Sequence, residues 1–384
     1  MTEKLFEQNA YCKEFTARVL SCEKKEEIYE IILDKTAFFP EGGGQGADKG
    51  TLNGADVLDV QNRGEEIVHT VAQEIPAGTE VTGKLDWELR FVRMQSHSAE
   101  HVVSGTVHAM FGYENVGFHM SERSMAVDFG GPLTAENILE VELAVNQAVW
   151  ENRSITASFP TREEAQAISY RSKLEITEGL RLVTIDGVDC CACCAPHVGS
   201  TGEIGLIKIL DFYPNKGGTR VEMIAGKYAL EDYMMLNASN KGIMKLLSAK
   251  RDEAESAVNR QFDLMNELKA ENARLSRRVA IAELKPNEVN GSAYAFCEQL
   301  SYDGLTHCTN FLLDKGMNVC VLLSNMGEGN FNYVVGSQQT DVRPLVKELN
   351  TAFSGKGGGK PNYAQGKIVC DDKETISGFL EKNL

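Results

Sequence analysis

Two short motifs, about ninety residues apart, require this chain to fold so that distant segments meet. The first is His97-Ser98-Ala99-Glu100-His101, and the second is Cys193-Cys194-Ala195-Pro196-His197. Histidines four residues apart lie on one face of a helix, within reach of a single ion. Two imidazoles from one segment, with a thiol and an imidazole from another, form a natural tetrahedral set for zinc. The motifs therefore predict one zinc ion per chain, with chemistry beside it because zinc can activate a bound water near neutral pH.

The residues alone leave three points open. Spacing does not decide which thiol binds the ion, because Cys190, Cys191 and Cys194 all lie close to Cys193. Four protein ligands are also typical of a closed structural zinc clamp, whereas catalytic zinc usually keeps one position free. Finally, the first motif has the form H-x-x-E-H, in which Glu100 would be the general base of a metalloprotease. That third interpretation requires a downstream carboxylate as a further ligand.

Size and charge limit the class of protein. A chain of 384 residues predicts two or three domains. The net charge of −16 opposes non-specific binding to nucleic acid. Residues 241–285 are different, because ten Lys or Arg against seven Asp or Glu give them a net charge of +3. An RNA ligand would need such a local basic surface.

The cysteines and the apolar runs indicate the compartment. Four of the ten cysteines fall within residues 190–194, too close together for all of them to pair comfortably. Such clusters in reducing compartments more often bind metals. No apolar run reaches membrane-spanning length, and Met1-Thr2-Glu3-Lys4 has no signal-peptide pattern. We therefore expect a cytoplasmic protein.

The order of strand-like and helical patterns predicts an α+β chain in four parts. Short β segments with turn residues between them, including a hairpin around Asn62-Arg63-Gly64, predict a small N-terminal barrel. Apolar residues from Phe91 to Met110 recur at helical spacing and place both histidines of the first motif on a helix. The expected parts are a β-barrel (1–88), an α+β zinc-binding domain (89–228), a long helix (229–285) and a C-terminal α/β domain (286–384).

The long helix has a heptad pattern. Its a positions are Val258, Met265, Asn272 and Val279, and its d positions are Ala254, Gln261, Leu268, Leu275 and Ala282. This pattern favours a homodimer through the helix, with Asn272 fixing the register. The alternative is a helix that lies on its own domain, which the polar Gln261 also fits. Pro286 predicts where the helix ends.

Two glycine-rich segments allow close backbone approach to a ligand. The first, Thr36 to Gly46, lacks the order of a P-loop, and a tight turn of the barrel explains it equally well. The second runs from Gly355 to Lys360, where backbone N–H groups with Lys356 and Lys360 would suit phosphates. Its alternative is a flexible basic loop. On residues alone, structural roles are favoured for Thr36 and His119, and His69, His108 and His307 are expected to be structural.

Taken in order, these segments resemble the long type of freestanding alanyl-tRNA editing proteins, relatives of the editing and C-terminal domains of alanyl-tRNA synthetase. The resemblance rests on Thr36 to Gln45, on Asp86-Trp87-Glu88-Leu89-Arg90 before the histidine pair, and on Cys193 to His197. It extends to Gly357-Gly358-Gly359-Lys360-Pro361 and Ala364-Gln365-Gly366, which are similar to the signature of the DHHA1 domain. One departure is Cys194-Ala195-Pro196, where the synthetases usually carry glycines after the cysteine.

The resemblance implies a function and a set of site residues. The zinc ligands would be His97, His101, Cys193 and His197. The substrate would be tRNA(Ala) wrongly charged with serine or glycine, and the reaction hydrolysis of the aminoacyl ester in trans. Thr36 would help to sense the serine hydroxyl, Gln45 would line the pocket, and His119 would lie near the terminal nucleotide. The C-terminal domain would hold the tRNA, with Lys356, Gly358 and Lys360 as contacts, and would offer a second possible dimer surface.

Overall fold

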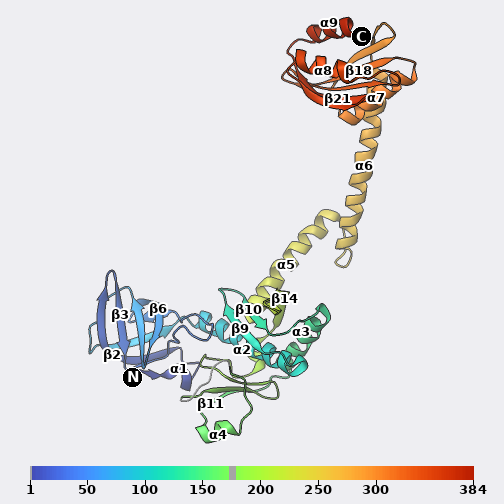
Figure 1. Cartoon of the computed structure of the whole chain (residues 1–384). Coiled ribbons are helices and arrows are strands. Elements are labelled where there is room, and N and C mark those ends of the chain that lie inside the picture. The colour runs from blue at the N-terminus through green and yellow to red at the C-terminus, as the bar shows by residue number, and fades with distance from the viewer. Residues whose placement is uncertain (1, 173–178) are drawn as a thin grey trace. The chain divides into compact units, whose positions relative to one another are not determined.

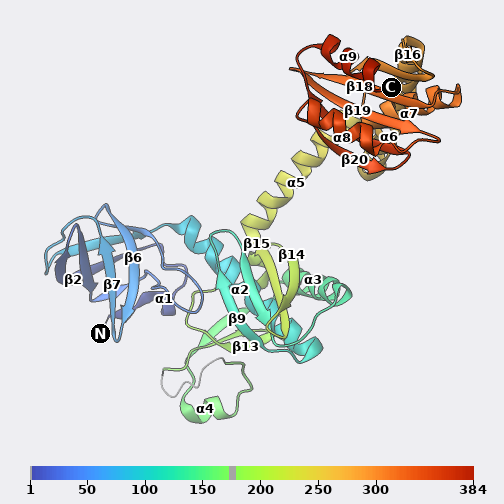
Figure 2. The ribbon, with the colours of Figure 1, turned by 45° about the horizontal axis from the view of Figure 1, so that its top comes forward.

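The structure is a computed structural model that describes residues 2–172 and 179–384. It divides into two compact units, Met1–Asn240 and Lys241–Leu384, shown as ribbons in Figures 1 and 2. Each unit is mixed α and β, as the sequence predicts. No helix in the described ranges combines the length and apolar character that a membrane crossing requires.

Six strands of the first unit pair in the order β2-β3-β7-β6-β5-β8 and close into a barrel. Alternate side chains along β2 are buried, because a strand of a closed sheet turns every second residue toward the interior. Val19, Ile31, Leu52 and Val60 belong to this core. The predicted hairpin is present, since β6 and β7 pair on either side of a turn after Arg63. The strands are β2 (Glu14–Lys25), β3 (Ile28–Leu33), β5 (Gly50–Leu52), β6 (Ala55–Arg63), β7 (Glu66–Val71) and β8 (Glu80–Leu85). A short β1 (Glu3–Lys4), α1 (Leu5–Gln8) and β4 (Lys35–Thr36) lie beside them, with β1 parallel to β4.

Helix α2 (Trp87–Phe111) follows the barrel and carries the histidine pair. The Asp86 carboxylate accepts a hydrogen bond from the Leu89 N–H at its start, and Gly112 ends it at φ 70°. Arg90, fully buried, pairs with Asp48 and donates to the Ala37 carbonyl at 2.6 Å. Asp48 in turn accepts from the Phe39 N–H at 2.7 Å. These bonds fasten the glycine-rich loop to the first turns of α2.

The rest of the first unit packs around α2. An antiparallel sheet in the order β14-β15-β10-β9 contacts α2 through β10 and β15, and α3 packs on α2. A smaller sheet, β11-β12-β13, leads into the second motif. The elements are β9 (Asn115–Met120), β10 (Met125–Phe129), α3 (Ala135–Trp150), β11 (Ile155–Ser158), α4 (Arg162–Gln166), β12 (Leu182–Ile185), β13 (Asp189–Ala192), a 3-10 turn (Thr201–Ile204), β14 (Ile207–Asn215) and β15 (Gly218–Ala225).

The prediction of one helix over 229–285 is wrong, because two helices occupy this stretch. These are α5 (Gly226–Leu247) and α6 (Ala254–Glu283). Ser248 adopts a left-handed conformation at φ 50°, and the Ala249 N–H bonds the Met244 carbonyl at 3.0 Å. This arrangement is a C-terminal cap that ends α5, and the spacing of apolar side chains does not predict it. The predicted end before Pro286 is confirmed, since α6 stops at Glu283.

The second unit contains a six-stranded sheet in the order β16-β17-β18-β19-β21-β20. β17 and β18 are parallel and joined by α7, and the other neighbours are antiparallel. Alternate residues of the strands face opposite cores: Ala295 and Leu322 lie with α7, whereas Val321 and Leu323 lie with α8 and α9. The elements are β16 (Asn287–Val289), β17 (Ser292–Glu298), α7 (Tyr302–Asp314), β18 (Val319–Gly327), β19 (Asn330–Ser337), α8 (Arg343–Ala352), β20 (Lys356–Lys360), β21 (Tyr363–Val369) and α9 (Lys373–Asn383). Figure 2 shows helices on both faces.

Candidate metal centre

The two sequence motifs meet in the first unit. His97 and His101 lie one turn apart on α2, both buried, with ring centroids 5.5 Å apart. The His197 ring forms a triangle with them, with its centroid 4.9 Å from that of His97 and 4.7 Å from that of His101. The Cys193 Sγ is 3.3 Å from the His197 Nε2 and 3.6 Å from the His97 Nε2. All four potential ligand atoms lie within 4.8 Å of one another.

A second layer of side chains orients the three imidazoles. The Nδ1 of His97 lies 2.9 Å from the Gln45 Oε1, and the Nδ1 of His101 lies 3.1 Å from the Asp189 Oδ2. The Nδ1 of His197 lies 3.0 Å from the Ser98 Oγ. With every Nδ1 engaged on the outside, each Nε2 is free to face the centre. This is the arrangement by which proteins fix the tautomer and the ring orientation of metal-binding histidines.

The donor set fits zinc. Ordinary Zn–N and Zn–S bonds in a tetrahedron place the ligand atoms about 3.4–3.7 Å apart. The measured S···N distances of 3.3 and 3.6 Å are close to that range. These two distances and the 4.8 Å limit on the others leave the set able to hold a zinc ion.

The structure also distinguishes among the clustered cysteines. Cys193 is the thiol that faces the three imidazoles. The Thr184 hydroxyl donates to the Cys190 Sγ at 3.4 Å, away from the histidines. Burial raises the pKa of Cys191 to about 11, and burial also raises that of Cys194. Cys191 belongs to a second possible ligand group with His101 and Asp189, which shares a residue with the first.

The environment favours the ionisation states that a metal requires at Cys193 and His197, but not at His101. Burial opposes the Cys193 thiolate, but interactions with His97, His197 and His101 hold the pKa of the thiol well below its usual value. Burial lowers the pKa of His197 to about 3. Burial also disfavours the charged form of His101, yet its bonds to Asp189 and Cys193 raise its pKa well above the usual value. Thiolate and neutral imidazole are the forms that bind metal, so a metal would displace a proton held by His101.

The loop that carries Cys193 is fixed by Arg181. Its Nη1 donates to the carbonyls of Cys193 at 2.8 Å and Ala195 at 3.0 Å. The Cys193 N–H in turn donates to the Arg181 carbonyl at 3.1 Å. The carbonyls that a flexible loop would leave to water are thereby satisfied, so Cys193 has a defined position without the glycines found in the synthetases.

A cavity of about 380 Å³ opens beside the four potential ligands. Its wall includes His97, Glu100, His101, Asn115, Phe118, Arg171, Arg181, the three residues Cys191, Cys193 and Cys194, and Gly43 of the glycine-rich loop. The Phe118 ring packs on His97 with centroids 5.1 Å apart. Gly44 has a φ of 83°, and a Cβ there would come within 2.7 Å of the Phe118 ring. The loop therefore needs glycine at this position to approach the cavity.

The other predicted pocket residues are placed differently. Gln45 bonds His97, as described above, and its Nε2 is buried without a partner. Thr36 is fully buried beside the barrel, and its Oγ1 lies 2.8 Å from the Nε2 of His69. His119 is exposed on β9, where strand alternation turns it away from the face of Phe118. Among the described residues, none of Thr36, Gln45 and His119 lines the cavity. Burial lowers the pKa of His69 to about 4, in keeping with the structural role expected for it.

Matches to known protein families fall in separate stretches of the chain. Family models match at residues 5–89 (tRNA synthetases class II (A)), 180–222 (Threonyl and Alanyl tRNA synthetase second additional domain) and 293–384 (DHHA1 domain). The alanyl-tRNA editing protein AlaX-L of Pyrococcus horikoshii is 28% identical over 403 residues, which cover 100% of this chain and 98% of that protein. Over nearly its whole length the chain is similar to alanyl-tRNA editing proteins. The resemblance seen in the sequence is confirmed.

Two further relatives agree with this result. The alanyl-tRNA editing protein Aarsd1 of Rattus norvegicus is 26% identical over 389 residues, 95% of this chain and 94% of that protein. The alanine–tRNA ligase of Ignicoccus hospitalis is 31% identical over 401 residues, 99% of this chain. The chain spans only 42% of the length of that ligase, but nearly the whole of the editing proteins.

The DHHA1 domain carries the second glycine-rich segment on an exposed edge strand. Residues 356–360 form β20 rather than a loop, paired only with β21. A Cβ at Gly357 would lie 2.2 Å from the Tyr333 hydroxyl, and one at Gly359 would lie 2.2 Å from the Tyr363 carbonyl. At Gly358 it would meet nothing within 4 Å. Packing thus requires two of the three glycines, and Gly358 lines a shallow groove with Arg343 and Lys347 of α8.

Several residues of the centre were missed in the sequence. Asp189, Arg171 and Ser98 bind or support the histidines, although no motif marks them. Asp189 stands four residues before Cys193, and an acidic residue beside a cysteine cluster was the available signal. Arg171 and Ser98 gave none, because their roles depend on contacts with residues distant in the sequence.

Proposed function

We propose that this chain is a trans-editing hydrolase that deacylates tRNA(Ala) wrongly charged with serine, and also with glycine. Support comes from the full-length similarity to alanyl-tRNA editing proteins. The observation that carries the proposal is the cluster of His97, His101, Cys193 and His197 at the wall of a cavity. A cavity with a few convergent polar groups is the usual form of an active site.

A second site is needed because serine exceeds alanine by only one hydroxyl group. A pocket that selects mainly by size rejects such an analogue by a factor of about 10². A separate hydrolytic site can instead bind the hydroxyl and so prefer the wrong amino acid. Thr36 was expected to sense this hydroxyl, but its Oγ1 is engaged with His69. A role for Thr36 would therefore be indirect, through the position of the adjacent glycine-rich loop.

Zinc, when bound by the four ligands, would supply a Lewis acid that anchors and polarises the aminoacyl end. The chain itself would orient the ester and stabilise the oxyanion formed when water attacks. The Gly42 N–H is already bonded to the Gln45 carbonyl at 3.0 Å. We assign the oxyanion donor to the backbone of Gly43, the loop residue that lines the cavity. Gln45 would act by holding His97 and not by touching substrate.

The DHHA1 domain would bind the body of the tRNA. Lys356 and Lys360 lie at the two ends of β20, and both are exposed. Gly358 between them offers backbone without a side chain in the way. The net charge of −16 does not prevent such phosphate contacts, because they require only a local basic surface. His119, exposed on β9, remains our proposed contact for the terminal nucleotide.

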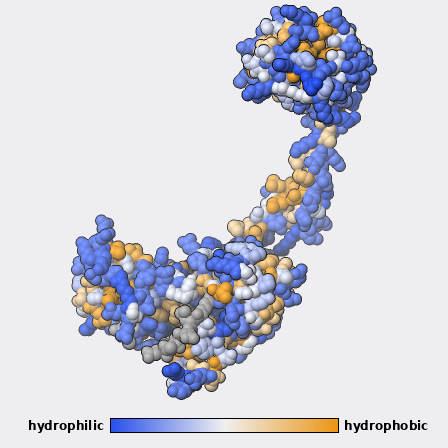
Figure 3. Space-filling view, in the orientation of Figure 1, coloured by the Kyte–Doolittle hydropathy of each residue, from blue (hydrophilic) through white to orange (hydrophobic). Residues whose placement is uncertain are grey.

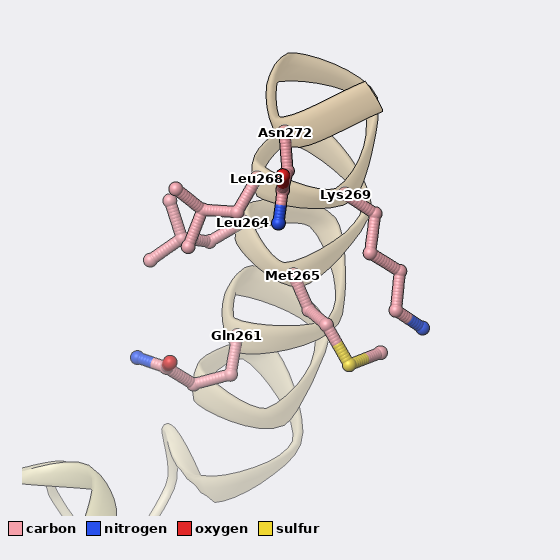
Figure 4. A pocket seen from close by; sticks show the side chains of 6 residues that line it. All are labelled: Gln261, Leu264, Met265, Leu268, Lys269 and Asn272. Carbon is pink, nitrogen blue, oxygen red and sulfur yellow. The ribbon is translucent and has the colours of Figure 1, made fainter. Parts of the chain in front are cut away.

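We also propose that α6 joins two copies of the chain. The last turns of α6 pack on their own domain through Ala280 and Ile281, and Arg277 pairs with Asp303. The predicted a and d residues Val258, Met265, Leu268, Leu275 and Val279 all remain exposed. Figure 3 shows apolar side chains on the surface of the stretch formed by α5 and α6, and Figure 4 shows Leu264, Leu268 and Asn272 projecting from α6. A parallel or antiparallel pairing of this helix would cover them.

One assay tests the proposed function against its alternatives. Purified protein is incubated with Ser-tRNA(Ala), Gly-tRNA(Ala) and Ala-tRNA(Ala), with and without a chelator, and the remaining ester is measured. Loss of serine and glycine but not alanine, prevented by the chelator, is the expected result. Tight binding of tRNA without hydrolysis would support an RNA-binding module with a closed structural zinc. Cleavage of peptides instead of esters would support the metalloprotease.

A further inference from the structure

We propose that Glu100 binds the α-ammonium group of the aminoacyl ester and so makes the site specific for esters of free amino acids. This inference rests on the proposed function and deepens it. Glu100 lies in the first motif, directly before His101, and its side chain is almost completely buried. It nevertheless lines the cavity beside the metal centre. The mechanism described above gives it no task.

The carboxylate is held so that Oε1 accepts two hydrogen bonds from the protein, whereas Oε2 has only the longer contact with His101. The Ser104 hydroxyl donates to Oε1 at 2.6 Å, and the Asn115 amide donates to the same oxygen. Asn115 is itself fixed, because its Oδ1 accepts from the Gly117 N–H at 3.0 Å. These bonds lock the rotamer of Glu100. They leave Oε2 directed toward His101, 3.8 Å from the Nε2 that faces the centre.

No arginine or lysine in the described part of the chain pairs with this carboxylate. Arg171 lines the same cavity, but it makes two bonds of 2.7 and 2.8 Å to Asp189. Lys4 pairs with Glu7 at 3.5 Å, and Arg181 donates to the carbonyls of the Cys193 loop. His101 pairs with Oε2 at 3.8 Å, which is beyond hydrogen-bonding distance, so no cation in the described part of the chain donates a hydrogen bond to this oxygen. A buried carboxylate oxygen without such a bond is costly. A cationic ligand that enters the cavity would remove this cost.

The proposed substrate carries such a cation at the required place. In an aminoacyl ester the ammonium group is attached to the carbon next to the ester carbonyl. A substrate whose carbonyl lies beside the metal-binding nitrogens would therefore present its ammonium to groups that border those nitrogens. Oε2 of Glu100 is such a group. The resulting charge-assisted hydrogen bond would select free aminoacyl esters over acylated or deaminated ones.

The test is a double cycle that combines a variant with a modified substrate. Glu100→Gln keeps an oxygen for Ser104 and Asn115 but removes the charge. The substrates are seryl-tRNA(Ala) and its deaminated analogue, 3-hydroxypropanoyl-tRNA(Ala), which adds no bulk. Removal of the ammonium also changes the intrinsic reactivity of the ester, but this difference cancels when the effect of the variant is compared between the two substrates.

We expect Glu100→Gln to lower kcat/KM for the seryl ester by about 10- to 100-fold, the range for a hydrogen bond between charged groups. The deaminated ester should change by less than about threefold. Glu114→Gln is the matched control, because Glu114 lines the same cavity but pairs with His108 at its exposed rim. It should affect both substrates little and equally. The zinc content of Glu100→Gln should equal that of the unmodified protein.

Three results would overturn the proposal: equal losses on both substrates, which indicate a role in activating water or in folding; loss of zinc, which indicates a metal ligand; or no effect on either ester. If the variant does not fold, a second measurement uses the unmodified protein. The amide-linked 3′-seryl analogue of the terminal adenosine should bind at least tenfold more tightly than its deaminated counterpart, and equal affinities would refute the proposal. An unmodified protein that leaves the seryl ester intact would refute the proposed function instead.

Discussion

Asp189 gives the sharpest test of the second layer around the centre. Its carboxylate lies between His101 and Arg171, with an Oδ2 to Nδ1 distance of 3.1 Å and bonds of 2.7 and 2.8 Å from the guanidinium. It is almost fully enclosed, so solvent screens these contacts little. Asp189→Asn keeps the shape of the side chain but removes the charge that orients His101 and raises its basicity.

The expected loss can be estimated. Substitution of a residue that supports a metal-binding histidine typically lowers metal affinity by about 10- to 100-fold. This corresponds to about 1.4–2.7 kcal/mol of zinc-binding free energy. The measurement is a titration of the metal-free protein with zinc in competition with a chromophoric chelator. The unfolding free energy of the metal-free variant is measured separately, because Arg171 loses its buried ionic partner.

Asp128→Asn is the matched control. Asp128 binds Arg220 through two hydrogen bonds of 2.6 and 2.7 Å, as Asp189 binds Arg171, but it contacts no candidate ligand. It should alter stability slightly and zinc affinity not at all. An unchanged zinc affinity in Asp189→Asn would refute the role given to the second layer. Equal losses of affinity in both variants would also refute it, since they would reflect general destabilisation.

Three further predictions concern other parts of the chain. Leu268→Glu places like charges in the α6 contact and should convert a dimer to a monomer in analytical ultracentrifugation. Asn266→Glu, outside the a and d positions, should leave the dimer intact. If the unmodified protein is a monomer, the proposed α6 contact does not exist. Lys356→Ala and Lys360→Ala should each weaken binding of tRNA(Ala) and reduce the slope of log K against log salt by about 0.7–0.9; a slope equal to that of the unmodified protein would remove these residues from the interface. Zinc affinity should rise with pH through the neutral range, because the pKa of His101 is raised in the metal-free chain and zinc must displace the proton that His101 holds. Calorimetry in two buffers of different ionisation enthalpy measures the release of this proton. A zinc affinity that does not depend on pH would contradict the prediction.

The sequence determined the features that depend on near neighbours. The apolar spacing from Phe91 to Met110 gave the helix that carries His97 and His101, and it is present as α2. Turn residues at Asn62–Gly64 gave the hairpin of β6 and β7. Strand patterns in the last hundred residues gave the α/β domain. In each case the pattern repeats within a few residues, so the local sequence contains the information.

Local pattern was insufficient where one residue or one distant contact decides the structure. The left-handed Ser248 divides the stretch 229–285, which the sequence predicts as one helix. The segment from Lys356 to Lys360 becomes a strand because β21 provides a partner for its backbone, although its composition equally suits a loop.

The metal centre also combines features that neighbouring residues determine with features that only distant contacts determine. Its ligand types could be read from two motifs, but spacing left four neighbouring thiols equivalent. Cys193 is distinguished because strand β13 and the bonds from Arg181 turn its sulfur toward α2. Gln45, Ser98 and Asp189 reach the histidines from three separate segments. Such contacts form only when the chain has folded, because burial and hydrogen-bond geometry depend on residues far apart in the sequence, whereas helix and strand periodicity depends on neighbours alone.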